Sequence, residues 1–395
     1  MTTTHDSAEH NMRKICIVVN SRANYARIKS VILAVQEHPQ LELQLIVGAS
    51  ALLDRFGRVI DIIRSDGIKE SAVVYMALEG DTPANMVKST ALGMIELSTL
   101  FEQTKPDVVL TVADRHETLA TAVSASYMNI PLAHTQGGEE TGSIDECVRH
   151  AITKLAHVHF PATAKARDTL LRMGEAPDKV FLTGCPAMDI VTSLASTKLD
   201  QDFFARNPGV GNSIDPLKPY IVVLQHPVTT EYGSAYAQID ETLNAILSQQ
   251  VQTVWLWPNI DAGTDQISKR LRQFRESRSS HPVFFVKNLS AEDYVRLIDN
   301  CACLVGNSSS ALREGALLGV PAVNIGTRQS NREHGPNVVH APYAHDAIDL
   351  AIRQQMAHGK YQSNALYGDG HAGKRIADIL ASVTLDIRKR LVFSN

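Results

Sequence analysis

Cysteines and long apolar runs are scarce in this sequence. Only five cysteines occur among 395 residues, an odd number, and none has the CxxC spacing of a zinc site. This cysteine usage favours a reducing compartment. The basic pair Arg13-Lys14 is followed by only five apolar residues, too few for a signal-peptide core or a membrane span. We therefore expect a cytoplasmic protein without membrane contact.

An excess of charge of one sign is also lacking. The 38 lysines and arginines nearly balance the 42 aspartates and glutamates, which leaves a net charge of -4. Such a chain has no general attraction for nucleic acid or anionic membranes, so any phosphate-binding site must be local. The sequence contains no Walker loop, no zinc-ligand spacing and no GxSxG nucleophile motif. These classes of site are therefore excluded.

Short apolar runs alternate with helix-length amphipathic stretches, which predicts a doubly wound, parallel α/β fold. A segment rich in proline, glycine and asparagine, 207–219, breaks this rhythm, and we interpret it as a linker. We expect an N-terminal Rossmann-like domain over 12–206 and a C-terminal one over 219–373. A helical stretch, Lys374–Val392 within 374–395, is expected to cross back onto the first domain. The predicted strands are Ile15–Val19, Leu43–Val47, Val73–Tyr75, Val108–Val112, Ile130–Ala133, Val158–Phe160, Val180–Leu182, Ile221–Leu224, Thr253–Leu256, Val283–Val286, Cys303–Val305 and Ala322–Ile325.

The densest group of ionisable residues is the loop His134–His150, which directly follows a predicted strand and contains Gln136, Glu139 and Asp145. Its two adjacent glycines allow the backbone to turn closely around a ligand. Ser143 with Glu146 has the spacing of a capping box, which predicts a helix whose N-terminus points at the same crevice. The alternative is a solvated loop followed by an ordinary capped helix.

Three other predicted strand ends carry related chemistry. Arg22 follows the first strand, Asp114 and Arg115 follow the strand at 108–112, and His226 follows the first strand of the second domain. Ligands of open α/β sheets bind beyond the carboxyl ends of the strands, so we expect a site in the cleft between the domains. A histidine there is suited to proton donation near neutral pH. The alternatives are an exposed turn arginine, a helix-start ion pair and a capping or core histidine.

The strongest signal for phosphate binding is the segment Gly306–Gly319. Its three serines, 308–310, are predicted to begin a helix, where hydroxyls, amides and the helix dipole stabilise a diphosphate. Glu314, about two turns into that helix, is suited to ribose hydroxyls, and Arg328 lies in a paired loop. The GxGxxG match at 368–373 has no strand before it, so we interpret it as coincidental.

Six motifs together match the pattern of one known family: Gln136-Gly-Gly-Glu139, Ser143–His157, Leu224–Thr230, Trp257–Gly263, Gly306–Ser309 and Asn324–Gln329. They resemble the hydrolysing UDP-N-acetylglucosamine 2-epimerases, over nearly the whole chain from about Lys14 to Ile376. The resemblance implies two Rossmann-like domains in the arrangement of GT-B glycosyltransferases, no metal, no redox cofactor and a UDP-sugar substrate. It also implies the chemistry of sialic-acid-type precursor synthesis.

The resemblance further implies that C2 of the sugar loses a proton while UDP leaves C1, giving a glycal to which water adds. By resemblance, Asp114 and Asp145 match acidic active-site positions and His226 matches a histidine of the cleft. The positions that match nucleotide-sugar contacts are Arg22, Arg115, Asn259, Ser308, Ser309, Glu314 and Arg328.

Gln136 departs from the pattern, because many members of the family have a glutamate at this position. An amide is not a general base near neutral pH. We therefore expect Gln136 to orient the substrate by hydrogen bonding, while Asp114, Asp145 or Glu139 transfers the proton. The change also allows a shifted substrate, such as a UDP- or GDP-linked 2,4-diacetamido sugar of the legionaminic type.

Two other classes stay open, a GT-B glycosyltransferase and a catalytically silent nucleotide-sugar sensor. A transferase would need an acceptor groove, and a sensor would keep Ser308, Glu314 and Arg328 while tolerating the change at Gln136. We also expect a homo-oligomer, a dimer or a tetramer, because oligomers are common in the family and long helices such as 86–101 suit an interface.

Overall fold

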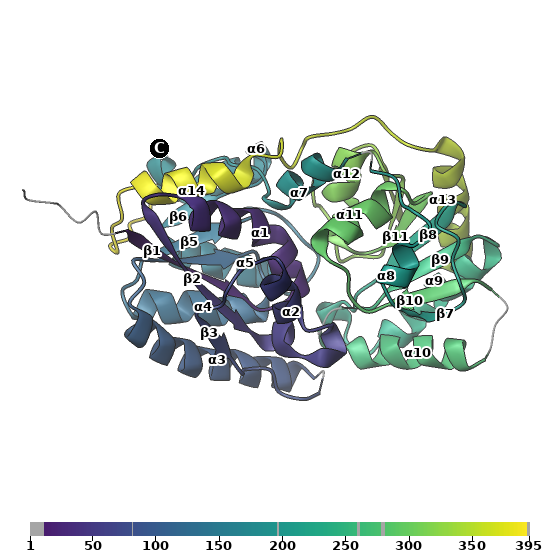
Figure 1. Cartoon of the computed structure of the whole chain (residues 1–395), viewed down its shortest axis with the longest axis horizontal. Coiled ribbons are helices and arrows are strands. Elements are labelled where there is room, and N and C mark those ends of the chain that lie inside the picture. Colours follow the sequence, from purple (N-terminus) through teal and green to yellow (C-terminus); the bar gives the residue numbers. More distant parts are fainter. Residues whose placement is uncertain (1–11, 81, 196, 259–260, 278–280, 393–395) are drawn as a thin grey trace, which may run out of the picture.

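The computed structural model describes residues 12–80, 82–195, 197–258, 261–277 and 281–392. They form two sheets that lie side by side, each with helices on both faces (Figure 1). A cavity lined from both halves lies between them. This confirms the predicted arrangement of two Rossmann-like α/β units that face a central cleft.

The first sheet has six strands within the described residues, in the order β3-β2-β1-β4-β5-β6. All of its strand pairs are parallel. The order reverses between β1 and β4, which is the topological switch point of a doubly wound sheet. The strands are β1 (Arg13–Val19), β2 (Leu41–Gly48), β3 (Ala72–Val74), β4 (Val108–Val112), β5 (Leu132–Thr135) and β6 (Val158–Phe160).

The second sheet repeats this topology and adds one edge strand. Its order within the described residues is β13-β12-β11-β8-β9-β10-β7, so the order reverses between β8 and β11. The added strand β7 comes from the predicted linker and pairs antiparallel with β10. The strands are β7 (Val210–Gly211), β8 (Tyr220–Leu224), β9 (Gln252–Leu256), β10 (Val283–Val286), β11 (Cys303–Gly306), β12 (Ala322–Ile325) and β13 (Val338–Ala341).

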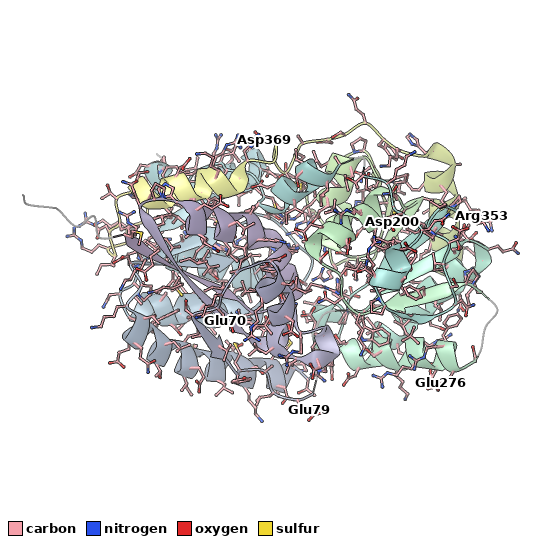
Figure 2. All side chains as sticks on the ribbon, viewed as in Figure 1. Glu70, Glu79, Asp200, Glu276, Arg353 and Asp369 are labelled. Carbon is pink, nitrogen blue, oxygen red and sulfur yellow. The ribbon has the colours of Figure 1, made fainter. Side chains whose placement is uncertain are left out.

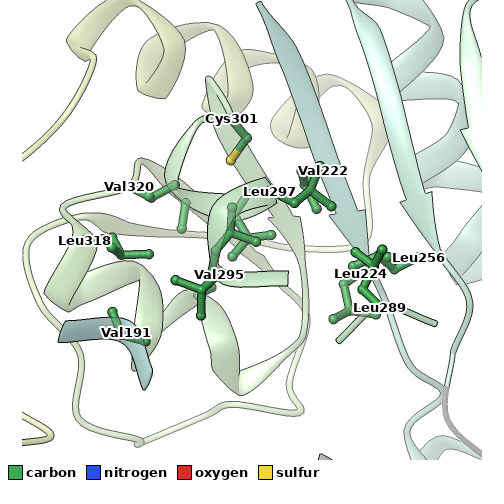
Figure 3. Packing of buried hydrophobic residues seen from close by; sticks show 14 of the residues in the cluster. Val191, Val222, Leu224, Leu256, Leu289, Val295, Leu297, Cys301, Leu318 and Val320 are labelled. Atoms are coloured by element: carbon green, nitrogen blue, oxygen red, sulfur yellow. The ribbon is translucent and has the colours of Figure 1, made fainter. Parts of the chain in front are cut away.

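Alternation of side chains along the strands builds a core on each face of each sheet. In β1, Ile15 and Ile17 enter one core while Cys16 and Val18 enter the other. Side chains of a strand alternate between the faces, so a parallel strand covered on both faces is apolar throughout. Figure 3 shows one core of the second sheet, where Leu224 of β8 lies beside Leu256 and Leu289.

Several helices begin with the capping chemistry their sequences suggest. Ser21 accepts a hydrogen bond from the amide of Asn24, and Thr82 precedes Pro83 in the first turn of the longest described helix. The helices are α1 (Arg22–Glu37), α2 (Val59–Ser65), α3 (Pro83–Thr104), α4 (His116–Tyr127), α5 (Asp145–Leu155), α6 (Ala164–Arg172), α7 (Ala187–Leu194), α8 (Phe203–Arg206), α9 (Ala235–Ser248), α10 (Thr264–Glu276), α11 (Ala291–Asp299), α12 (Glu314–Leu318), α13 (His345–His358) and α14 (Ala372–Ser382).

The last helix crosses back to the first sheet, as predicted. In Figure 1 the yellow α14 lies against the purple α1. Arg13 of β1 donates to the carbonyl oxygens of Leu380 at 2.5 Å and Val383 at 3.1 Å. The helix ends at Ser382, however, and the chain continues to Val392 without regular structure, so the predicted helical stretch was too long.

Two further expectations need correction or stay open. Val180–Leu182 is not a strand, because only Val180 forms an isolated bridge, with His159. Apolar residues between 185 and 203, including Met188 and Phe203, pack into a core of the second sheet. This stretch, which we predicted in the first domain, thus contacts the second sheet. The domain boundaries at 206 and 219 stay a prediction.

Several charged side chains lie at the periphery of the fold. Figure 2 shows Asp369, Glu79 and Glu276 at its outer edges. Exposed ion pairs, such as that of Asp369 with Arg375 at 2.7 Å, contribute little to stability. Among the described residues, no helix combines the length and apolarity needed to span a membrane.

Candidate active site

The cavity lies where the switch points of the two sheets face each other. The turns after β1 and β4 carry Arg22, Asp114 and Arg115, and the turns after β8 and β11 carry His226 and Ser308. Strand order brings the two turns of each sheet together, and the packing of the two halves brings the two pairs of turns to one cavity. The polar and charged residues that line the cavity are Arg22, Tyr25, Arg27, Asp114, Arg115, Thr141, Ser143, Asp145, His226, Ser290, Tyr294, Ser308, Ser309, Ser310, Glu314, Arg328, Gln329 and Arg332.

Asp114 and Asp145 both line this cavity, but their surroundings separate their acidities. Asp114 is paired with the fully buried Arg149. Burial alone would raise the pKa of Asp114, yet the charges of Arg149, Arg27 and Arg332 hold it well below its usual range. Asp114 is therefore ionised throughout the physiological pH range.

Among the described residues, the carboxylate of Asp145 forms no ion pair as close as that of Asp114 with Arg149. Burial raises the pKa of Asp145 to about 6, and the negative charge of Asp114 adds to this effect. Arg328 opposes the shift only in part, with its guanidinium 3.8 Å from the carboxylate. Asp145 therefore changes its protonation state close to neutral pH.

Asp145 is also the first residue of α5, so the predicted capping box differs from the structure. The hydroxyl of Ser143 accepts a hydrogen bond from the amide of Asp145 at 3.3 Å. Glu146 instead accepts from the amide of Thr141, at 2.6 Å. The helix thus begins one residue later than the motif predicts, and its first residue faces the cavity.

Glu139 and Gln136 are buried, and the cavity lining within the described residues includes neither. Glu139 pairs with Arg313 and, at 2.7 Å, with Arg332. Burial opposes its ionisation, but these arginines lower the pKa of Glu139. The Gln136 backbone has a φ of 62°, which strains a residue with a side chain. Its side-chain amide has no hydrogen-bond partner within the described residues.

His226 lies in the cavity with its backbone fixed across two strands. Its amide donates to Asn307 Oδ1 at 2.7 Å, and Asn307 Nδ2 donates back to its carbonyl at 2.8 Å. Burial, followed by the positive charges of Arg328, Arg22 and other arginines, lowers the pKa of His226 well below its usual value. The imidazole is therefore neutral near pH 7.

Two of the predicted cations have partners on the opposite half, and Arg115 also pairs with Glu117 of its own half. Arg115 pairs with Glu117 at 3.0 Å and with Asp261 at 2.8 Å. Arg22 donates to the carbonyls of Lys287 at 2.6 Å and Trp257 at 3.2 Å. These contacts fix the guanidinium groups across the cleft.

The serine-rich segment differs from its predicted helix. Ser309–Ala311 forms a single 3₁₀ turn capped by Ser308, and α12 starts only at Glu314 and has five residues. Glu314 therefore begins that helix instead of lying two turns into it. It still lines the cavity, where burial raises its pKa. Asn259, another predicted contact, lies outside the described residues.

Two cavity arginines were missed by sequence reasoning. Arg27 donates to the hydroxyl of Ser309 across the cleft. It lies five residues after Arg22 on α1, about 140° away around the helix axis, so its spacing from Arg22 offered no signal. Arg332 donates to Gln329 Oε1 at 2.8 Å, and no sequence signal pointed to it. Within the described residues, no cluster of three or more His, Cys, Asp or Glu side chains could hold a metal ion.

Two switch-point sheets around a cavity lined by arginines, hydroxyls and carboxylates define an α/β protein of the GT-B arrangement. The family model described as UDP-N-acetylglucosamine 2-epimerase matches residues 33–381. The chain belongs to this family.

Individual relatives match along nearly the whole chain. A UDP-N,N'-diacetylbacillosamine 2-epimerase (hydrolyzing) of Legionella pneumophila is 31% identical over 375 residues, which cover 95% of this chain and 97% of the relative. A UDP-N-acetylglucosamine 2-epimerase of Neisseria meningitidis is 27% identical, covering 93% and 95%. The crystal structure of a Neisseria meningitidis UDP-GlcNAc 2-epimerase bound to UDP-GlcNAc has a TM-score of 0.76 at 20% identity, covering 93% of this chain and 99% of that one. That likeness concerns the fold.

Proposed function

We propose that this protein is a hydrolysing 2-epimerase that converts a UDP-linked 2-acetamido sugar into UDP and the free 2-epimeric sugar. The observation that carries the proposal is the carboxylate pair of the cavity. Asp114 is held ionised, whereas the pKa of Asp145 lies at about 6. Carboxylates whose environments separate their acidities are a recurrent basis for acid and base roles in one site.

Asp145 is the proposed base for C2. It faces the cavity, and its pKa lies near the working pH, where a general base combines ionisation with useful basicity. As it takes the C2 proton, the C1–O bond to the diphosphate breaks, UDP departs with the bonding electrons, and a C1–C2 double bond forms. Asp114, paired with Arg149, is a much weaker base and serves as a fixed negative charge beside it.

The charge of the cavity suits the diphosphate. The cavity lining contains five arginines and three carboxylates among the described residues, so its net charge is positive. Arg27 and Arg328, beside Ser308 and Ser309, supply donors where charge develops on the leaving group. Among the described residues, one carboxylate oxygen of Glu314 has no hydrogen-bond partner, which suits a ribose hydroxyl.

The second half-reaction adds water to the glycal. A water molecule supplies the hydroxyl group that adds to C1. A proton adds to C2 on the face opposite to the one that lost its proton, so the overall change is UDP-sugar plus water to free sugar plus UDP. The neutral His226 is proposed to hydrogen-bond in this step, since burial and arginines keep it from being protonated. The predicted hydrogen bond from Gln136 to the substrate stays a prediction.

A 2,4-diacetamido UDP-sugar is a second candidate substrate within the same reaction. The relative of Legionella pneumophila with this substrate in its name is 31% identical over nearly the whole chain. Val59, Ile62 and Leu289 give the cavity an apolar wall, which suits methyl groups better than sugar hydroxyls.

The test offers purified protein UDP-N-acetylglucosamine and UDP-N,N'-diacetylbacillosamine separately, in deuterated water. We expect UDP and a free 2-epimeric sugar with deuterium at C2, both detected by nuclear magnetic resonance. A nucleotide-linked epimer would instead support a non-hydrolysing enzyme. UDP release only with an added acceptor would support a glycosyltransferase, and binding without turnover would support a sensor.

A further inference from the structure

Glu139 occupies an unusual position for a carboxylate of the loop His134–His150, which we call the acidic loop. It follows β5 of the first sheet and is 5% exposed, and its carboxylate pairs with two arginines of the second half. Arg313 precedes α12, and Arg332 lies in the loop after β12. The ion pairs therefore join the acidic loop to the opposite wall of the cleft.

From Arg332 a chain of hydrogen bonds leads to the reactive groups. Arg332 donates to Gln329 Oε1 at 2.8 Å, and Gln329 Nε2 donates to the carbonyl of Asn307 at 2.9 Å. Asn307 also accepts from Arg328 at 3.3 Å and clamps the backbone of His226 at 2.7 and 2.8 Å. Glu139 is thus connected to both cavity residues without facing the cavity itself.

The same two loops also meet through their backbones. The amide of Gly142 donates to the carbonyl of Arg328 at 3.1 Å. A Cβ on Gly142 would lie 1.9 Å from the carbonyl oxygen of Thr327, so only glycine permits this approach. Gly142 has no positive φ, so alanine would fit its own loop and clash only across the cleft.

We propose that Glu139 is a positioning residue and not the C2 base. Its carboxylate neutralises Arg313 and Arg332 when the acidic loop closes on 326–332, and thereby sets the positions of Arg328 and His226. The inference rests on the proposed function, which needs Asp145 and the diphosphate-binding groups in one closed cavity. Without the carboxylate, two buried cations would face each other across the gap it leaves.

The test compares Glu139→Gln with the wild type. The glutamine keeps the size of the side chain but not its charge. A displacement of catalytic groups by about 1 Å costs roughly 100-fold, so we expect kcat/KM to fall by this order. The midpoints of the pH profile should stay where they are, because Asp145 is untouched. Loss of the acid limb would overturn the proposal and make Glu139 the base, and unchanged kinetics would overturn it as well.

Glu175→Gln is the matched control. Glu175 is a buried carboxylate of the first half that pairs with Lys154 at 2.8 Å, His159 at 2.9 Å and Lys389 at 2.6 Å, away from the cavity lining. Both variants should lose stability, but only Glu139→Gln should change kcat/KM. Equal kinetic losses in the two would show a general effect of buried-charge removal and contradict the proposal.

Gly142→Ala and a closure measurement make the test independent of turnover. Small-angle scattering with and without UDP should show closure of the wild type and of Glu175→Gln, and a weaker response of Gly142→Ala and Glu139→Gln. If the wild type closes on UDP but turns over neither UDP-sugar, the proposed function fails while Glu139 keeps its role. If both cleft variants close like the wild type, the positioning role fails.

Discussion

The carboxyl edges of the two sheets have the same topology but present different groups to the cavity. The edge of the first sheet supplies the acids Asp114 and Asp145, whereas that of the second supplies His226, the serines and Arg328. In the proposed reaction, the C2 base therefore comes from the first half alone, whereas the diphosphate is held from both halves, by Arg27 of the first and by Arg328 and the serines of the second. Neither half holds the complete set of groups, so the reaction requires the cleft to close around its substrate.

The most severe break of this division is Asp145→Asn on the acidic side. Loss of a general base costs about 10²- to 10⁴-fold, and we expect kcat to fall toward the upper end of this range. Release of UDP measured by a coupled assay checks it, while UDP affinity should change little. The control is Cys147→Ser, an exposed position two residues further along α5. Asparagine variants within about tenfold of wild type would remove Asp145 from the reaction.

A smaller effect is expected from the loss of one cation that reaches across the cleft, Arg27. In Arg27→Met, one donor to the leaving group is lost, and such losses cost about 10²- to 10³-fold in rate. Unlike Asp145→Asn, this variant should also weaken the binding of UDP itself, as measured by calorimetry. Arg167→Met, which removes a half-exposed arginine paired with Asp168, should leave both quantities unchanged. Unaltered UDP affinity in Arg27→Met would place the diphosphate elsewhere.

The pH dependence sharpens the contrast between the two carboxylates. Burial raises the pKa of Asp145 to about 6, so kcat/KM should fall about tenfold per pH unit below that value as the base becomes protonated. Asp114 contributes no such limb, because its pKa is held well below the usual range. A profile flat from pH 5 to 7 would contradict the assignment of the base to Asp145.

The smallest effect on activity is expected at Glu175, outside the cleft. Burial opposes its ionisation, but His159, Lys154 and Lys389 lower the pKa of Glu175 to about 2. A carboxyl group whose pKa is lowered by folding stabilises the fold at pH values above its pKa in the unfolded chain. This stability is lost as the pH falls from about 4.5 to 2. The difference corresponds to roughly 3 kcal/mol. Urea unfolding of Glu175→Gln at pH 7 and pH 3 should show a large deficit only at pH 7.

Much of the fold was predictable because apolar periodicity and turn chemistry are local. The strands carrying the switch points, from β1 and β4 to β8 and β11, all contain predicted apolar runs. Val180–Leu182 was mispredicted since an apolar run does not specify a pairing partner. The short β13 was missed, because edge strands with polar residues have a weak pattern.

The site divides in the same way. The sequence by itself determined which polar residues end the strands, and hence that Asp114, Asp145, His226 and Arg328 belong to one cleft. Only the tertiary structure decided that Glu139 turns away to Arg313 and Arg332 while Asp145 faces the cavity. The physical reason is that acidity and pairing depend on burial and on charges from the other half of the chain, which no local pattern contains.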